Sequence, residues 1–225
     1  EWNYRISYGS DCKMDLSQVR SDPVLSQKQL PHMQHRIQSM TEDLNKLTTV
    51  ELGLLFPIII SDYNPGWAKM YQDEKNSILL YDKKKNILKI EHIGSTSVPG
   101  LSAKPTIDIL IEIADTTDCK SFIKIFSKIG YQLISKPDNP PPHIMLAKGY
   151  SLTGITGQTY HIHLRYSGDW DELYFRDYLI MNPKTARQYG DLKKELSILY
   201  KNDREKYTSA KSDFIKSIVK LVRGQ

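Results

Sequence analysis

The sequence predicts an α+β fold, in which helices back a mixed β-sheet and the carboxy-terminal tail is helical. Three observations predict it. Residues 106–113 alternate in side-chain character with the period of two that is typical of a strand. Residues 143–149 and 160–166 also read as strands, and the glycine-containing loop between them favours a hairpin. From Trp170 onward the apolar residues recur with helical spacing. Strands and helices mixed in this way indicate α+β.

Size and composition limit the class of protein. The chain has 225 residues, of which 40% are hydrophobic and 25% charged, as is typical of a soluble globular protein with an ordinary to large domain. No apolar run approaches the roughly 20 residues that span a bilayer, and the first residues lack the features of a secretory signal. We therefore expect a cytoplasmic protein that has no membrane partner. The sequence does not indicate an oligomeric state.

The chain divides into an extension and one domain. Residues 1–39 are polar and show no sustained period, so we expect an extension that is disordered or of separate origin. The domain is expected at residues 40–225. It should begin with a short helix, because Thr48 and Glu51 have the spacing of a capping box.

Further helices are expected on both sides of the strands. Asn64 and Pro65 offer a cap and a first-turn proline for a helix that ends at about residue 84. Residues 118–129 are amphipathic and precede a glycine. In the tail, the pairs Asn182-Pro183 and Asn202-Asp203 interrupt the helical pattern, which predicts about three helices.

The strand at 106–113 carries a carboxylate on its polar face. Four isoleucines at odd positions share one face, while Asp108, Leu110 and Glu112 share the other. One apolar face is typical of a half-buried sheet whose second face is wet. Asp108 should therefore look into a cleft or into solvent.

A turn rich in hydroxyl groups precedes this strand. Gly94, Ser95, Thr96 and Ser97 follow a predicted strand that ends at His92 and Ile93. Glycine permits a tight turn and the close approach of a ligand, and the exposed N–H and hydroxyl groups of such a turn can bind an anion. An ordinary serine- and threonine-rich loop is the alternative interpretation.

A second polar strand face lies further along the chain. His161, His163 and Arg165 alternate with apolar and aromatic residues, and so share one face. If this strand neighbours the Asp108 strand, the imidazoles and the guanidinium would line the same cleft. The alternative is a pair of surface histidines or hydrogen-bonded histidines without a ligand.

The string HIGSTSVPGLSAKPTIDIL at residues 92–110 resembles the signature of the GrpB family, which is assigned to the nucleotidyltransferase superfamily. Similar segments cover roughly residues 40 to 223, including YHIHLRYSGDWDELYFRDYL and DREKYTSAKSDFI. The resemblance implies a nucleotidyltransferase-like mixed sheet. It also implies that the Gly-Ser turn binds nucleotide phosphate and that carboxylates on the next strand hold divalent metal.

The carboxylates depart from the superfamily pattern. Asp108 fits the first metal position, but Leu110 occupies the second, and Glu112 lies about 6.6 Å further along the strand. Imidazoles with one carboxylate suit Zn²⁺, Mn²⁺ or Fe²⁺, whereas oxygen ligands suit Mg²⁺. We therefore expect a site for one divalent ion at Asp108, His161 and His163, to which His92 could contribute.

Basic residues complete the expected site. Lys104 follows the turn and could neutralise phosphate, beside Asp108 as a catalytic residue. Arg176 either reaches a phosphate or pairs with Asp177 on its own helix. In the tail, Arg204, Tyr207 and Lys211 share one helix face, which supplies anion contacts if it points at the cleft.

Three functions follow from these residues. The first is a nucleotidyltransferase-like protein that binds a nucleotide or a phosphorylated small molecule and transfers a nucleoside monophosphate to an unidentified acceptor. The second is a non-catalytic module that binds such a ligand through a degenerate metal site. The third, to which the basic tail gives only weak support, is nucleic-acid binding.

Overall fold

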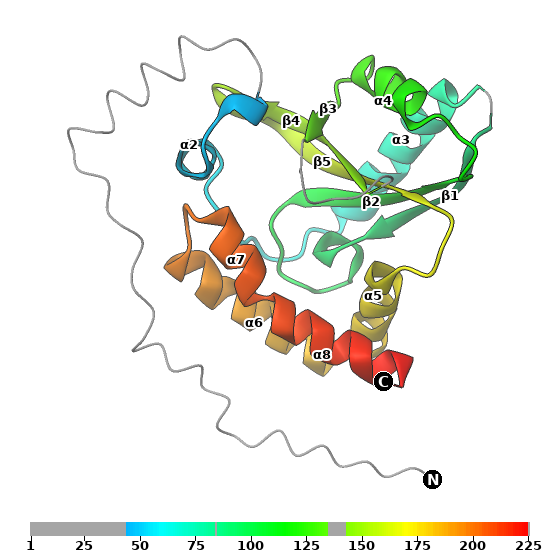
Figure 1. Cartoon of the computed structure of the whole chain (residues 1–225). Coiled ribbons are helices and arrows are strands. Elements are labelled where there is room, and N and C mark those ends of the chain that lie inside the picture. The colour runs from blue at the N-terminus through cyan, green and yellow to red at the C-terminus, as the bar shows by residue number, and fades with distance from the viewer. Residues whose placement is uncertain (1–43, 84, 135–142, 225) are drawn as a thin grey trace.

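The computed structural model describes residues 44–83, 85–134 and 143–224 (Figure 1). The expected extension at 1–39 lies outside these residues. Within them, no helix is long and apolar enough to cross a membrane. In chain order the elements are η2 (Leu44–Lys46), α2 (Thr49–Leu55), α3 (Gly66–Tyr81), β1 (Ile87–Ile93), η3 (Ser95–Ser97), β2 (Thr106–Ile113), α4 (Cys119–Ser127), β3 (Gln132–Ile134), β4 (Ile144–Ser151), β5 (Gly154–Tyr166), α5 (Asp171–Met181), α6 (Pro183–Leu199), α7 (Arg204–Ala210) and α8 (Ser212–Arg223).

The strands form one five-stranded mixed sheet in the order β1-β2-β5-β4-β3. β2 and β5 are parallel, and the other neighbours are antiparallel. The chain passes through α4, β3 and β4 before it returns as β5, which provides the long crossover that a parallel pair needs. The predicted α+β fold and the hairpin of β4 with β5 are confirmed.

One face of the sheet carries the main core. The isoleucines at odd positions of β2 are fully buried there, as their alternation predicted. Helices α3 and α4 cover this face, on the far side of the sheet from α5–α8 (Figure 1). Each helix contributes large apolar side chains to the same cluster, namely Trp67 and Ile78 from α3 and Phe122 and Phe126 from α4.

The opposite face of β2 is less wet than predicted. Leu110 is 1% exposed and Glu112 is 4% exposed, while the side chain of Asp108 remains 26% exposed. The loop after β5 and helix α5 cover the far end of this face, where the hydroxyl of Ser167 donates to Glu112 and Arg165 pairs with α5. Only the beginning of the strand stays open, so the expectation of a wet second face was wrong beyond Asp108.

The tail consists of four helices rather than three, because α7 ends at Ala210 and α8 begins at Ser212. These helices do not pack on the main core. They form a second core with the loop that joins η3 to β2, made of Val98, Leu101, Leu179, Ala186 and Tyr189. The tail is therefore attached to the segment that runs from the Gly94 turn to Asp108.

Helix α2 packs against α7 and against the loop that precedes it. The predicted capping box is confirmed, because Glu51 N–H donates to the Thr48 hydroxyl and Thr48 N–H donates to the Glu51 carboxylate. Gly53 is buried, and a Cβ atom there would lie 1.7 Å from the backbone oxygen of Asn202. Only glycine lets α2 approach the loop between α6 and α7 this closely.

We predict that Gly53→Ala lowers the free energy of unfolding by about 2 kcal/mol or more, because the backbone of Asn202 must move. Gly190→Ala in α6 is the matched control. Its Cβ would meet a methyl group of the Leu101 side chain at 3.3 Å and the backbone nitrogen of Ser102 at 4.0 Å, and alanine gains about 1 kcal/mol of helix propensity. Urea unfolding measures both variants, and equal midpoints would contradict this packing.

Candidate functional site

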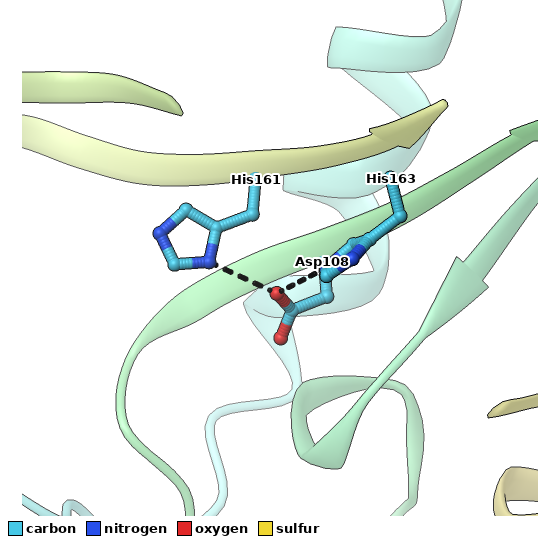
Figure 2. Close-up of side chains that lie close together, drawn as sticks. All are labelled: Asp108, His161 and His163. Atoms are coloured by element: carbon cyan, nitrogen blue, oxygen red, sulfur yellow. Dashed lines mark hydrogen bonds and ion pairs between the residues drawn. The ribbon is translucent and has the colours of Figure 1, made fainter. Parts of the chain in front are cut away.

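The parallel pairing of β2 with β5 brings the carboxylate and the two imidazoles together. In the register of the two strands, Asp108 lies opposite His161 and Leu110 lies opposite His163. Asp108 Oδ1 is 3.2 Å from His161 Nδ1 and 3.2 Å from His163 Nε2. Figure 2 shows both rings converging on this carboxylate. The ligand atoms of the three side chains all lie within 4.8 Å of one another, a grouping that can hold a metal ion.

Tyr150 on β4 orients one of the rings. Its hydroxyl is 2.9 Å from His161 Nε2, and the two rings stack with centroids 5.6 Å apart. Because an ionised carboxylate only accepts hydrogen bonds, His161 Nδ1–H donates to Asp108. Nε2 of the neutral ring then accepts a hydrogen bond from the Tyr150 hydroxyl. Reversing this hydrogen bond would free Nδ1 for a metal ion while the ring stays in place. Tyr150 was not predicted as a site residue, since nothing in the sequence shows which residue of β4 meets His161.

The protonation states suit metal binding. Burial would raise the pKa of Asp108, but the hydrogen bonds from His161 and His163 outweigh it and hold the pKa well below its usual range. Burial lowers the pKa of His161 to about 4, although the Asp108 carboxylate opposes this shift. At neutral pH the aspartate is therefore ionised and His161 is neutral, which are the forms that ligate metal ions.

The glycine of the Gly94–Ser97 turn packs directly against the carboxylate. Gly94 has φ +70°, and a Cβ atom there would lie 2.6 Å from Asp108 Oδ2. Two of the three hydroxyls in the turn are engaged in the fold. The Thr96 hydroxyl donates to the backbone oxygen of Thr106, and the Ser97 hydroxyl donates to that of Gly94.

The third hydroxyl, that of Ser95, has no hydrogen-bond partner among the described residues. Ser95 is half-buried and comes directly after Gly94, whose backbone touches Asp108. Of the three hydroxyls, it is therefore the one that can donate to a ligand at the carboxylate without breaking a contact of the fold.

His92 lies on the other face of the sheet. It is paired with Ile109 across β1 and β2, and cross-strand partners point to the same side. Its ring stacks on Tyr71 of α3 at 4.7 Å, and Nε2 donates to the Thr96 hydroxyl at 3.0 Å. The structure therefore does not bring His92 into the group of metal-ligating atoms, contrary to the expectation that it could contribute.

Arg165 is also remote from the carboxylate. It lies opposite Glu112, four residues beyond His161 and so about 13 Å along the strand. Its guanidinium donates to Glu172 of α5 at 3.5 Å and to the backbone oxygen of Leu164. The shared face was correct, but the expected shared cleft was wrong, because α5 covers this end of the face.

Arg176 has a structural role. Its guanidinium donates to Glu91 at 2.9 Å, to the backbone oxygen of His92 at 3.0 Å and to Asp177 at 2.7 Å. These contacts attach α5 to β1 and engage Nε and Nη1 of the guanidinium. Of the two expected roles, the structure thus places Arg176 in the internal ion pair.

An open hollow of about 420 Å³ lies at the outer edge of β1, away from the Asp108 cluster. Its lining includes Tyr71, Glu91, His92, Ser97 and Arg176. Most of the polar groups there already bond to one another, so the hollow offers few free donors or acceptors. The cluster at Asp108, by contrast, brings together a carboxylate and two imidazoles that can share a ligand.

Lys104 and the tail complete the surroundings of Asp108. Lys104 is half-buried in the loop before β2. Burial, together with the positive charges of Arg204 and Lys211, lowers the pKa of Lys104 to about 7, whereas Asp108 opposes the shift. The direction of the tail face could not be predicted from the sequence. Arg204 and Lys211 both act on Lys104, and Asp108 acts on the pKa of Lys211, which favours a tail face that points toward the cleft.

The comparisons with known proteins agree with this fold. A family model described as "GrpB protein" matches residues 57–221. The chain belongs to the GrpB family. It is 32% identical over 166 residues to the glutamate-rich protein GrpB of Alkalihalophilus pseudofirmus, covering 72% of this chain and 94% of that protein. A UPF0157 protein of Streptomyces coelicolor is 34% identical over 179 residues, with 76% and 89% of the two chains covered.

A solved structure of this family has the same fold. The crystal structure of the conserved protein GrpB from Enterococcus faecalis superposes with a TM-score of 0.63 at 35% sequence identity. The match covers 73% of this chain and 96% of that one. The predicted membership of the GrpB family is thus confirmed.

We predict that Gly94→Ala destabilises this GrpB-family chain more than Gly100→Ala does. Both glycines have positive φ, so each substitution costs on the order of 1–3 kcal/mol of backbone strain, and the ψ of −172° places Gly94 in a region that is essentially restricted to glycine. Only at position 94 does the new Cβ also meet the Asp108 carboxylate, since nothing lies within 4 Å at position 100. Urea unfolding compares the two variants. Equal losses would show that the Gly94 turn does not press on Asp108.

Proposed function

We propose that this GrpB-family chain binds one divalent transition-metal ion at Asp108, His161 and His163, and a phosphorylated small molecule beside it. The observation that carries the proposal is the convergence of one carboxylate and two imidazoles within 4.8 Å. This donor set suits Zn²⁺, Mn²⁺ or Fe²⁺. Three protein ligands also leave a coordination position for water or a substrate oxygen.

The residues do not fit the two-magnesium site of the nucleotidyltransferase superfamily. That site needs a second carboxylate near the first, but Leu110 is apolar and buried. Glu112 is occupied at the far end of the strand, where it accepts from Ser167 and lies 3.8 Å from Lys89 Nζ. We therefore derive no step from two-metal chemistry.

Phosphate recognition is supported by groups on two sides of Asp108. The free hydroxyl of Ser95 can donate to a phosphate oxygen from the Gly94 side. Lys104 supplies positive charge from the loop before β2, and burial of this lysine without a close carboxylate partner favours the arrival of an anion. The ligand class that the family resemblance implies is a nucleotide.

The reaction that we propose is the transfer of a nucleoside monophosphate to an oxygen of an acceptor. The acceptor oxygen forms a bond to the α-phosphorus, the bond to the departing pyrophosphate breaks, and the acceptor proton passes to solvent. Lys104 would offset negative charge on the transferred group. The buried Leu110 favours a second candidate, a module that binds the same ligand without transferring it.

We predict that Zn²⁺ or Mn²⁺ binds the wild-type chain, and that His161→Ala and His163→Ala each weaken binding at least tenfold, because each removes one ligand. Isothermal titration calorimetry of the metal salt measures this. His143→Ala is the control, since His143 lies outside the cluster and should leave the affinity unchanged. Equal affinities of the wild type and both ligand variants would refute the metal site.

Transfer and simple binding make different predictions. If the chain is an enzyme, incubation with labelled nucleoside triphosphates, Mn²⁺ and cell extract should transfer label to an acceptor, and Asp108→Asn should abolish the transfer. Ser97→Ala is the control, because its hydroxyl is engaged with Gly94. Nucleotide that binds the wild type without any transfer would support the module and contradict the enzyme.

A further inference from the structure

The cations of the tail helices fall into two groups. Those on the outside pair with carboxylates at the surface or are exposed to water: Lys194 lies 3.1 Å from Asp62, Arg223 lies 2.6 Å from Asp169, and Lys216 is exposed. Lys193, Arg204 and Lys211 point inward from the same helices. None of these three has a carboxylate within ion-pair distance in the part of the chain that the structure describes.

The inward cations contact only carbonyl oxygens and aromatic rings. Lys193, which is 2% exposed, donates to the backbone oxygen of Ser102 and lies 4.7 Å from the centre of the Tyr189 ring. Lys211 lies 4.4 Å from the centre of the Tyr207 ring. These contacts satisfy some donors but leave the positive charge without a counterion.

Arg204 adds a third charge of this kind. Its guanidinium donates to the backbone oxygen of Phe56 at 3.0 Å and is half-buried. Burial of a cation without an acidic partner is rare in proteins, because its desolvation is costly. Three such residues on the tail therefore indicate that an anionic ligand binds beside them.

These charges act on one another and on the site at Asp108. Burial is the largest cause that lowers the pKa of Lys104 and of Lys193. Arg204 and Lys211 lower the pKa of Lys104 further, and Lys211 lowers that of Lys193 further. Asp108 is the carboxylate that opposes the shifts of Lys104 and Lys211. This carboxylate is already hydrogen-bonded to two histidines.

We propose that Lys104, Lys193, Arg204 and Lys211 form a second anion subsite, the tail subsite, for a further phosphate group of the substrate that binds at Asp108. The ligand class is a phosphate ester with at least two linked phosphates. A single phosphate at Asp108 would leave Lys193, Arg204 and Lys211 without an anion, which a second linked phosphate would supply. This inference rests on the proposed function and extends it from the sheet to the tail.

A purely structural role for the same cations predicts the opposite change in stability when they are substituted. A cation that stabilises the fold should cost stability when it is removed. A cation kept for a ligand should cost little, or its removal should raise stability, because the buried charge is uncompensated in the free protein. Lys211→Met tests this most cleanly, since the Lys211 ammonium lies over the Tyr207 ring and replacement by methionine roughly keeps the length of the side chain.

The experiment compares the binding of orthophosphate, pyrophosphate and tripolyphosphate to the metal-free full chain by calorimetry. We expect tripolyphosphate to bind at least tenfold more tightly than orthophosphate. Lys211→Met and Lys193→Met should each weaken tripolyphosphate about tenfold, because each removes a charge-assisted contact. Lys194→Met is the matched control on the same helix and should change nothing. Equal affinities for the three anions, or equal losses in Lys193→Met and Lys194→Met, would overturn the tail subsite.

Two further measurements separate this inference from the proposed function. Lys211→Met should bind Zn²⁺ or Mn²⁺ as the wild type does and should unfold at an equal or higher urea concentration. A wild type that binds tripolyphosphate but no metal would overturn the metal site and support the tail subsite. A wild type that binds metal but prefers no linked phosphate would overturn the tail subsite alone. A lower unfolding midpoint in Lys211→Met would likewise assign that lysine to the fold and overturn its proposed role.

Discussion

The parallel pairing of β2 with β5 is the contact on which the candidate site depends. Two groups 53 residues apart in the chain, Asp108 and His161, become partners only because the strands run side by side in this register. A buried hydrogen bond between Thr106 and Thr159, at 2.9 Å, joins the same two strands one pair earlier on that face. A shift by one residue would turn the histidines toward α3 and α4 and bury them in the apolar core.

The same pairing explains why charge, rather than a deep cavity, distinguishes this end of the sheet. Asp108 is the acceptor for two imidazoles, and the tail brings uncompensated cations toward it. The tail is attached through Val98 and Leu101, which lie between the Gly94 turn and β2. Packing of the second core therefore determines how α6, which carries Lys193, lies against the loop before β2. In the function that we propose, the sheet supplies metal ligands and the tail supplies anion contacts.

The features that depend on local periodicity could be predicted from the sequence. The buried isoleucines, the hairpin of β4 with β5 and the shared face of His161 and His163 all follow from the period of two. The α+β class and the capping box at Thr48 were predictable for the same kind of local reason. No long-range contact was needed for any of them.

The features that depend on register and layering could not be predicted in this way. His92 faces α3 because of its pairing with Ile109, and Arg165 is covered by α5, which no local pattern reveals. Tyr150 reaches His161 only through the hairpin register. The inward direction of Lys211 depends on how α8 packs against α5, α6 and α7. The spacing of Lys211 and Arg204 in the sequence could not predict this direction.

X-ray absorption spectroscopy at the metal edge tests the central claim most directly, because it reports the ligands of a bound ion rather than the strength of binding. Protein loaded with one equivalent of Zn²⁺ should show a first shell of nitrogen and oxygen at about 2.0–2.2 Å with the outer-shell scattering of two imidazole rings. In the double variant His161→Ala/His163→Ala that imidazole signal should disappear. A shell of oxygen alone in the wild type would contradict the site at Asp108, His161 and His163.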